Sequence, residues 1–365
     1  MRNTINAGIQ ILLYAAAVLF AACQPLGGDF EEWRKKAIED AGGVVPGKNL
    51  AAQLKWLDSY AASNRKYVLE VKADESISGG SLGYGKKNIT ITLKGIGANR
   101  TISLSSNRMM FRVNSGVTLV LDNITLKGRI DNTESLVKID SGGTLVMNPG
   151  SVVTGNTYSY SDFSYSSNSY SESYGGGVYV DYGTFTMNGG TISGNTATNT
   201  YGGGVYVRGG TFTMNGGTIS SNTASSFGGG GGVYVYSGTF TMSGGTISGN
   251  TASSFGGGGG VYVDYGTFTM SGGTISSNTA FYGGGVYVGR GTFNKTGGTI
   301  YGYSADDANS NVTKDFFGEV KSNQGHAVYV YISAYSNKRK ETTAGSGVNL
   351  SFNGSNGSFS GDWDY

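Results

Sequence analysis

The chain has 365 residues, of which 14% are charged, and its formal net charge is only +2. This near balance excludes the large basic surface that nucleic-acid binding requires, so no nucleic-acid partner is expected. One Cys and one His exclude a disulfide framework, a Cys/His zinc cluster and any catalytic site that needs two histidines. The 64 glycines alternate with β-branched and aromatic residues, which indicates repetitive β-structure rather than disorder.

Residues 1–22 have the features of a secretory signal peptide. Arg2 supplies the positive end, an apolar run extends from Ile9 to Phe20, and two alanines precede Cys23. The run barely reaches the length that a membrane-spanning helix needs. A lone Cys directly after small residues resembles the signal of bacterial lipoproteins, which implies cleavage before Cys23 and acylation of that residue. We therefore expect the protein to leave the cytoplasm and to be held to a membrane by lipid.

Residues 23–66 are predicted to form a short tether and a helical cap. Apolar residues recur at helical spacing in two segments, 30–41 and 49–62, and glycines and a proline separate them. Two amphipathic helices ahead of stacked strands can cover the open apolar end of the stack. That end would otherwise be a template for pairing with other chains.

From Tyr67 the apolar period changes to two, and residues 67–300 are predicted to form a parallel β-helix. Within it, residues 174–300 repeat nearly the same sequence, and the first Val of each GGGVYV motif falls at 178, 205, 233, 261 and 286. Units of this length with three strand-like runs are typical of a coil that contributes one strand to each of three sheets. The predicted fold class is all-β, a single-stranded right-handed parallel β-helix of eight or nine coils with a short N-terminal helical cap.

Alternation along each strand predicts which side chains enter the core. In each repeat we expect the valines of VYV, the Phe and Met of TFTM and the Ile of TIS inside, stacked from coil to coil. An internal ladder of amide hydrogen bonds is predicted from the residue that recurs after the third strand: Asn195, Asn222, Asn250 and Asn278. Residues 301–365 are predicted to hold an inserted loop, the last coil or coils and a C-terminal cap closed by Trp363, with His326 at the loop surface.

These motifs resemble the repeat-bearing β-helix lipoproteins of spirochaetes, especially treponemes. The matching stretches include AAQLKWLDSYA, GVTLVLDNITLKG, GGTLVMNPGSVVTGNT and the GGGVYV…GGTISGN array, and they cover most of the chain after Cys23. The resemblance implies a pectin-lyase-like fold and a location at the outer membrane or cell surface. A weaker similarity, through GGGVY and the FTMN of 185–188 and 212–215, is to chlamydial polymorphic outer-membrane proteins, which are adhesins.

The outward positions of the first strand of each coil form a predicted ligand-binding column: Tyr179, Tyr206, Tyr234, Tyr262, Tyr287 and Tyr329. Exposed aromatic strips with charges beside them bind sugars or partner proteins. The alternative interpretation is that the stacked tyrosines are cross-strand packing. We expect a monomeric adhesion module for host or matrix glycans or proteins, without a cofactor.

A second function class, a polysaccharide-active enzyme, would use charges beside this column. Asp140, Asp181 and Arg208 are expected on successive coils, with Lys138 next to Asp140, if the long loop after Asn156 keeps the register. β-Helix polysaccharide lyases use acids, a base and Ca²⁺ on this sheet, so Ca²⁺ is expected only under this alternative, and no other metal is. The competing interpretation is a solvated salt-bridge ladder.

Two outward columns of threonines raise a third candidate, ice binding. The TFTM strands place these side chains on one face, at Thr184 and Thr186, Thr211 and Thr213, Thr239 and Thr241, and Thr267 and Thr269. They resemble the flat Thr arrays of ice-binding β-helices. Threonine is also an ordinary residue of exposed strands, so scaffold is the competing interpretation.

Overall fold

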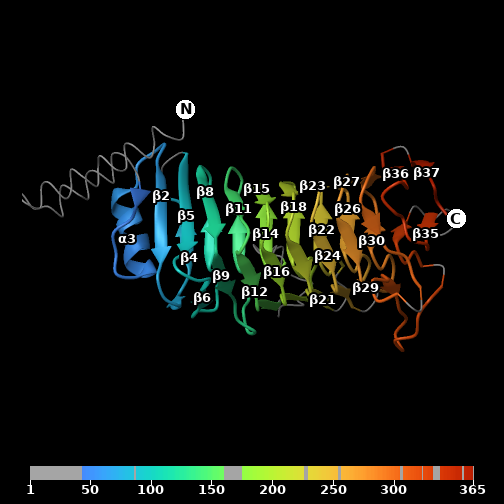
Figure 1. Ribbon diagram of the computed structural model, residues 1–365, viewed down its shortest axis with the longest axis horizontal. Coiled ribbons are helices and arrows are strands. Elements are labelled where there is room, and N and C mark those ends of the chain that lie inside the picture. Colours follow the sequence, from blue (N-terminus) through green and yellow to red (C-terminus); the bar gives the residue numbers. More distant parts are fainter. Residues whose placement is uncertain are drawn as a thin grey trace, which may run out of the picture.

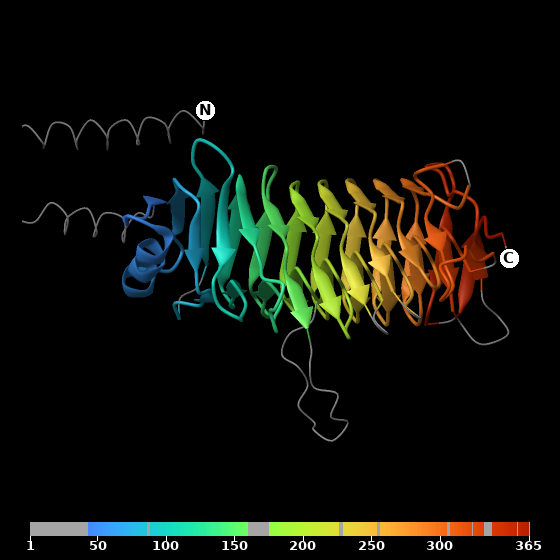
Figure 2. The same ribbon diagram turned by 90° about the horizontal axis from the view of Figure 1, so that it is seen from below.

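The computed structural model describes residues 43–85, 88–159, 175–225, 229–253, 256–304, 307–322, 324–331, 338–355 and 357–364. The predicted signal peptide, Cys23 and the predicted helix 30–41 lie outside the described residues. The chain forms a parallel β-helix of about eight turns, and its coils stack in chain order along the long axis (Figure 1, Figure 2). The predicted all-β solenoid is confirmed.

In the described ranges the strands form four sheets, one more than predicted. The ten-stranded sheet carries the VYV motifs and contains β4 (Gly80–Leu82), β7 (Phe111–Val113), β10 (Val137–Ile139), β14 (Val178–Asp181), β18 (Val205–Arg208), β22 (Val233–Tyr236), β26 (Val261–Asp264), β30 (Val286–Val288), β34 (Val328–Val330) and β35 (Lys338–Lys340). The twelve-stranded sheet carries the TFTM motifs and contains β1 (Gly43–Val44), β2 (Lys66–Val71), β5 (Ile89–Gly95), β8 (Val117–Asp122), β11 (Thr144–Met147), β15 (Thr184–Met187), β19 (Thr211–Met214), β23 (Thr239–Met242), β27 (Thr267–Met270), β31 (Thr292–Lys295), β36 (Leu350–Asn353) and β37 (Ser358–Gly361).

The remaining two sheets complete each coil. The nine-stranded sheet contains β3 (Glu75–Ile77), β6 (Arg100–Leu104), β9 (Ile124–Lys127), β12 (Val152–Thr154), β16 (Thr191–Ser193), β20 (Thr218–Ser220), β24 (Thr246–Ser248), β28 (Thr274–Ser276) and β32 (Thr299–Ile300). The unpredicted six-stranded sheet contains β13 (Thr157–Ser159), β17 (Thr196–Thr198), β21 (Thr223–Ser225), β25 (Thr251–Ala252), β29 (Thr279–Ala280) and β33 (Val312–Thr313). Its strands are only two or three residues long, too short for alternation to reveal them in the sequence.

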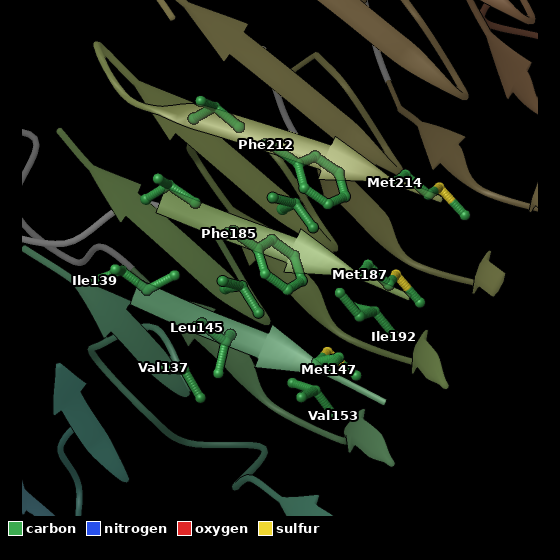
Figure 3. Close-up of a cluster of buried hydrophobic side chains, with 14 of the residues drawn as sticks. Val137, Ile139, Leu145, Met147, Val153, Phe185, Met187, Ile192, Phe212 and Met214 are labelled. Atoms are coloured by element: carbon green, nitrogen blue, oxygen red, sulfur yellow. The ribbon is translucent and has the colours of Figure 1, made fainter. Parts of the chain in front are cut away.

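Inward side chains stack by type between coils, as Figure 3 shows for the central repeats. Phe185 pairs in register with Phe212, and their ring centroids are 4.6 Å apart with 6° between the ring planes. Met187 and Met214 pair in the same way and are fully buried. Each ring therefore buries both faces against its neighbours, and the predicted core assignment is confirmed.

The predicted asparagine ladder is confirmed. Asn195 Nδ2 and its backbone N–H both donate to Asn222 Oδ1 at 3.0 Å. The same pair of hydrogen bonds links each further member to the next, through Asn250 and Asn278 to Asn311. Each side chain thus satisfies buried backbone groups at a turn that no strand hydrogen bond reaches.

The N-terminal end of the stack is covered by the helix α3 (Leu50–Tyr60), which confirms the second predicted helix (Figure 1). Asn49 caps it by accepting the Ala52 N–H at 2.9 Å. Leu50 and Leu57 are fully buried and belong to the core of the first coil. The helix therefore covers the apolar end of the first coil.

The C-terminal end is closed by strands that reverse direction, because β36 is antiparallel to β31 and β35 is antiparallel to β34. Lys295 occupies the core position that Met270 holds one coil earlier. Its ammonium donates to the carbonyls of Gly345 and Val348 at 2.7 and 2.6 Å, and burial lowers its pKa. Trp363 packs partly buried against the core, as expected for a cap residue.

Candidate functional site

The predicted tyrosine column runs in register along the ten-stranded sheet, but it is not exposed. Ring centroids of successive tyrosines are 4.7 to 5.6 Å apart. Tyr179, Tyr206, Tyr234 and Tyr329 are at most 7% exposed. The two others, Tyr262 and Tyr287, are partly buried. The prediction of an exposed aromatic strip at these positions is wrong.

Glycine-rich segments that lead into each coil cover the tyrosines. A Cβ at Gly229 would overlap the ring of Tyr262, and one at Gly257 would lie 2.6 Å from the ring of Tyr287. Tyr201, from the preceding connection, stacks on the column with a centroid distance of 4.5 Å to its nearest partner. The glycines are needed there because backbone lies directly on aromatic rings. The column is a second packed layer outside the core.

A buried carboxylate, Asp264, lies against this layer and is fully paired. The Tyr234 hydroxyl donates to its Oδ2 at 3.3 Å. Arg290 Nε and Nη2 donate to its two oxygens at 3.1 and 3.2 Å. Burial, followed by the neighbouring Tyr206 and Asp264, raises the pKa of the Tyr234 phenol, so it remains a neutral donor.

The predicted charged cluster comes together, because the long loop keeps the register: Lys138 pairs with Tyr179, and Asp181 with Arg208. Lys138 Nζ lies 3.2 Å from Asp181 Oδ2 and 3.8 Å from Asp140 Oδ1. Arg208 Nη1 lies 3.6 Å from Asp181 Oδ1. The Lys138 side chain is only 4% exposed, whereas Arg208 is 39% exposed, so the cluster is buried at its centre and solvated at its edge.

Arg112, which pairs in register with Lys138, extends the cluster. Its Nε donates to Asp140 Oδ2 at 2.6 Å, so each of the two carboxylates lies between two cations. Asp181 Oδ1 is nevertheless buried without a hydrogen-bond partner among the described residues. Three cations and two carboxylates leave a net positive charge at the end of the tyrosine column nearest the N-terminus.

Exposed aromatic side chains lie two or three positions after the column tyrosines, where strands of the ten-stranded sheet end. We define the turn strip by its members on successive coils: Tyr182, Arg208, Tyr236, Tyr265, Arg290 and Tyr331. Its tyrosines are between 36 and 56% exposed. The predicted aromatic surface therefore exists, but on different residues.

Cation–π and edge-to-face contacts order the turn strip. The guanidinium of Arg208 lies 5.7 Å from the centroid of Tyr182, and that of Arg290 lies 4.0 Å from the centroid of Tyr265. Tyr236 meets Tyr265 edge to face at 5.9 Å. Tyr182 and Tyr265 both have φ near +58°. The sequence signal is the DYG that follows VYV at 181–183 and 264–266.

The predicted threonine columns lie in register on the twelve-stranded sheet, for example Thr184 beside Thr211 and Thr239. The phenylalanine rings beneath them differ by only 6 to 7° from strand to strand.

His326, expected at the surface, is only 4% exposed, so that prediction is wrong. Its Nδ1 accepts the Thr313 N–H at 3.0 Å, and its ring stacks on Tyr303. Burial lowers its pKa against the opposing effect of Glu341, 3.7 Å away. His326 therefore joins the inserted loop to the last coil, and no local sequence pattern indicates this contact because neither partner is a neighbour along the chain.

Comparison of the chain with protein-family models, curated proteins and solved structures finds no match. No helix within the described ranges is long and apolar enough to span a bilayer. In the same ranges, no three His, Cys, Asp or Glu side chains lie together as ligands for a metal ion. The turn strip and the charged cluster are therefore the two candidate functional sites.

Proposed function

We propose that the protein is a lipid-anchored, non-enzymatic binding module at the cell surface, and that it holds an extended glycan along the turn strip. The observation that carries the proposal is the row of exposed tyrosines with interleaved arginines, repeated at the coil spacing of about 4.8 Å. A row of this kind presents the same chemistry at regular intervals, as a linear polymer does.

Tyrosine and arginine suit this role for physical reasons. Aromatic rings offer an apolar face and a polar edge, and they lose little conformational entropy when they bind. Arginine donates several hydrogen bonds in a fixed geometry to hydroxyl or carboxylate oxygens. Arg290 is already held by Asp264, and Arg208 lies close to Asp181. These two side chains therefore lose little conformational entropy when a ligand binds.

Replacing Tyr182, Tyr236 and Tyr265 together with alanine is expected to weaken glycan binding at least tenfold, because truncated aromatic anchors typically cost more than about 1 kcal/mol each. A glycan array would identify the ligand, and calorimetry would measure its Kd. The control is Tyr303→Ala, a comparably exposed tyrosine outside the strip, which should leave Kd unchanged. Unaltered glycan binding by the triple variant would contradict the proposal. Binding to matrix proteins but to no glycan would show that the ligand is a peptide.

A polysaccharide-cleaving enzyme is the second candidate. It is favoured by the buried ammonium of Lys138 between Asp140 and Asp181, and by Asp181 Oδ1, which is buried beside Arg208 without a hydrogen bond among the described residues. In this proposal the cluster, with Arg208, would act on an acidic sugar. Loss of polymer cleavage in Asp181→Ala, with binding retained, would favour the enzyme, whereas glycan binding without cleavage in the unaltered protein would favour the adhesin.

Anchoring at Cys23 draws on the sequence of residues 1–23, and exposure at the outer membrane draws on the resemblance of the repeat motifs to β-helix lipoproteins. Incorporation of labelled palmitate that is lost in Cys23→Ala would support the anchor, and protease shaving of intact cells would report exposure. The third candidate, ice binding, draws on the threonines in register on the twelve-stranded sheet, and absence of thermal hysteresis would dismiss it.

A further inference from the structure

A second exposed apolar feature lies on a hairpin near the C-terminal end, away from the turn strip. Residues 313–321 form an antiparallel hairpin, in which Lys321 N donates to Thr313 O and Asp315 N to Glu319 O, both at 2.9 Å. Phe317 at its tip is 90% exposed, the highest value among the large hydrophobic side chains described. In Figure 1 the orange loop beyond β29 projects sideways from the stack.

The hairpin is held rigid although its tip is apolar. Asp315 Oδ1 accepts the backbone N–H groups of both Phe317 and Glu319, at 2.8 and 2.9 Å. At its base, Phe316 packs on Phe281 with a centroid distance of 5.0 Å, and the ammonium of Lys321 lies 3.7 Å from the centroid of Phe281. A pre-ordered segment that leaves a phenylalanine in water is suited to bury it in a partner.

A matching recess lies at the opposite end of the solenoid. A cavity of about 330 Å³ opens between α3 and the first coil. Its floor is apolar, formed by Leu54, Ile77, Leu82 and Phe111. Its rim carries one charge of each sign, on Lys55 and Asp58, both exposed on α3. None of the described residues of the chain fills it.

Hairpin and cavity lie along the same corner of the molecule. The hairpin follows β33, the last strand of the six-stranded sheet, which from β13 onward lies between the nine- and ten-stranded sheets. The cavity is lined by 76–82, the segment that joins β3 of the nine-stranded sheet to β4 of the ten-stranded sheet. Two copies placed side by side and antiparallel would therefore bring each hairpin to the other's cavity, as a closed twofold pair requires.

We propose that this protein associates with a second copy of itself as an antiparallel pair, in which Phe317 of each copy enters the cavity beneath α3 of the other. The charges are complementary: Glu319 and Lys314 flank the tip, and Lys55 and Asp58 flank the cavity. A bilayer is the poorer occupant, because the Asp315 carboxylate and Glu319 would enter it with the tip. The inference goes beyond the proposed function and involves none of the turn strip.

Sedimentation of the full chain over a concentration series tests the pairing. A monomer–dimer equilibrium is expected, and Phe317→Ser should weaken it at least roughly tenfold. Glu319→Lys and Lys55→Glu should each weaken it, and the two changes together should restore it, which loss of folding could not produce. Ile130→Ser, at a residue that is 84% exposed outside both patches, is the matched control. A monomer at every concentration would overturn the proposal.

Photocrosslinking identifies the occupant. With benzoyl-phenylalanine in place of Phe317, and a mixture of isotope-labelled and unlabelled chains, crosslinks are expected between copies, at Leu54, Lys55 or Tyr84. Crosslinks confined to one copy, or to residues away from the cavity, would overturn the pairing. A crosslink from benzoyl-phenylalanine at Leu54 to residues 30–41 of the same chain would also overturn the pairing, because that segment would then occupy the cavity. Ligand binding at the turn strip is measured separately, so failure of one proposal does not imply failure of the other.

Discussion

Replacing Asn250 with alanine is expected to lower the free energy of unfolding by about 3–5 kcal/mol, a larger effect than most single substitutions have. The side chain joins two neighbouring coils. Its Oδ1 accepts the backbone and side-chain N–H groups of Asn222, and its Nδ2 donates to Ile219 O and Asn278 Oδ1, all at 2.9 to 3.0 Å. Alanine removes this partner from the Asn222 backbone N–H and from Ile219 O, whereas Asn222 Nδ2 keeps Ile192 O and Asn278 Oδ1 keeps the backbone N–H of residue 250. Each buried group left unpaired costs about 1–3 kcal/mol when water does not reach it.

Urea unfolding followed by circular dichroism measures this loss, and hydrogen exchange should place the weakened amides in the two adjacent coils. Asn215→Ser is the matched control. Asn215 also belongs to an asparagine pair, with Asn188 at 3.0 Å, but that pair is exposed, and serine already stands at the equivalent position in the next coil, at Ser243. Its effect should stay within about 0.5 kcal/mol. Equal losses in the two variants would show that the internal ladder contributes no more than a surface pair.

The scaffold was predictable because its signals are local and repeated. The period of two along each strand predicts which side chains face inward. The fivefold repeat predicts the register, because like residues such as Phe185 and Phe212 must stack if the coils are equivalent. The internal ladder followed from the same logic, because an asparagine at every equivalent turn bonds its copies above and below. The six-stranded sheet was not predicted, because alternation is not measurable in strands of two or three residues.

The surface was harder to predict because alternation tells which side of a strand a residue occupies and not what covers it. Tyr262 does face away from the core, but the backbone at Gly229 lies on its ring. The glycines before each VYV allow that close approach because they carry no Cβ. The exposed tyrosines at 182 and 265 sit in turns with positive φ, where the strand period no longer applies. The arginines that contact these tyrosines lie on other coils, so no local sequence pattern predicts the contacts.

Replacing Tyr234 with alanine separates the packed column from the turn strip. The ring is 3% exposed and lies between Tyr206 and Tyr262, with centroid distances of 4.9 and 5.0 Å, while its hydroxyl donates to Asp264. Removing it opens a cavity and leaves one oxygen of a buried carboxylate with fewer donors. We expect a loss of about 3 kcal/mol or more in the free energy of unfolding.

Two further variants sharpen this test. Tyr234→Phe keeps the ring and removes one hydrogen bond, so it should cost about 1 kcal/mol, because Arg290 still pairs Asp264. Tyr265→Ala, at a half-exposed turn position, should change stability by less than about 1 kcal/mol but weaken glycan binding. Urea unfolding and calorimetric titration on the same three proteins give both quantities. If Tyr234→Ala lost binding at unchanged stability, while Tyr265→Ala behaved like the unaltered protein, the ligand would lie on the tyrosine column and the turn strip would be scaffold.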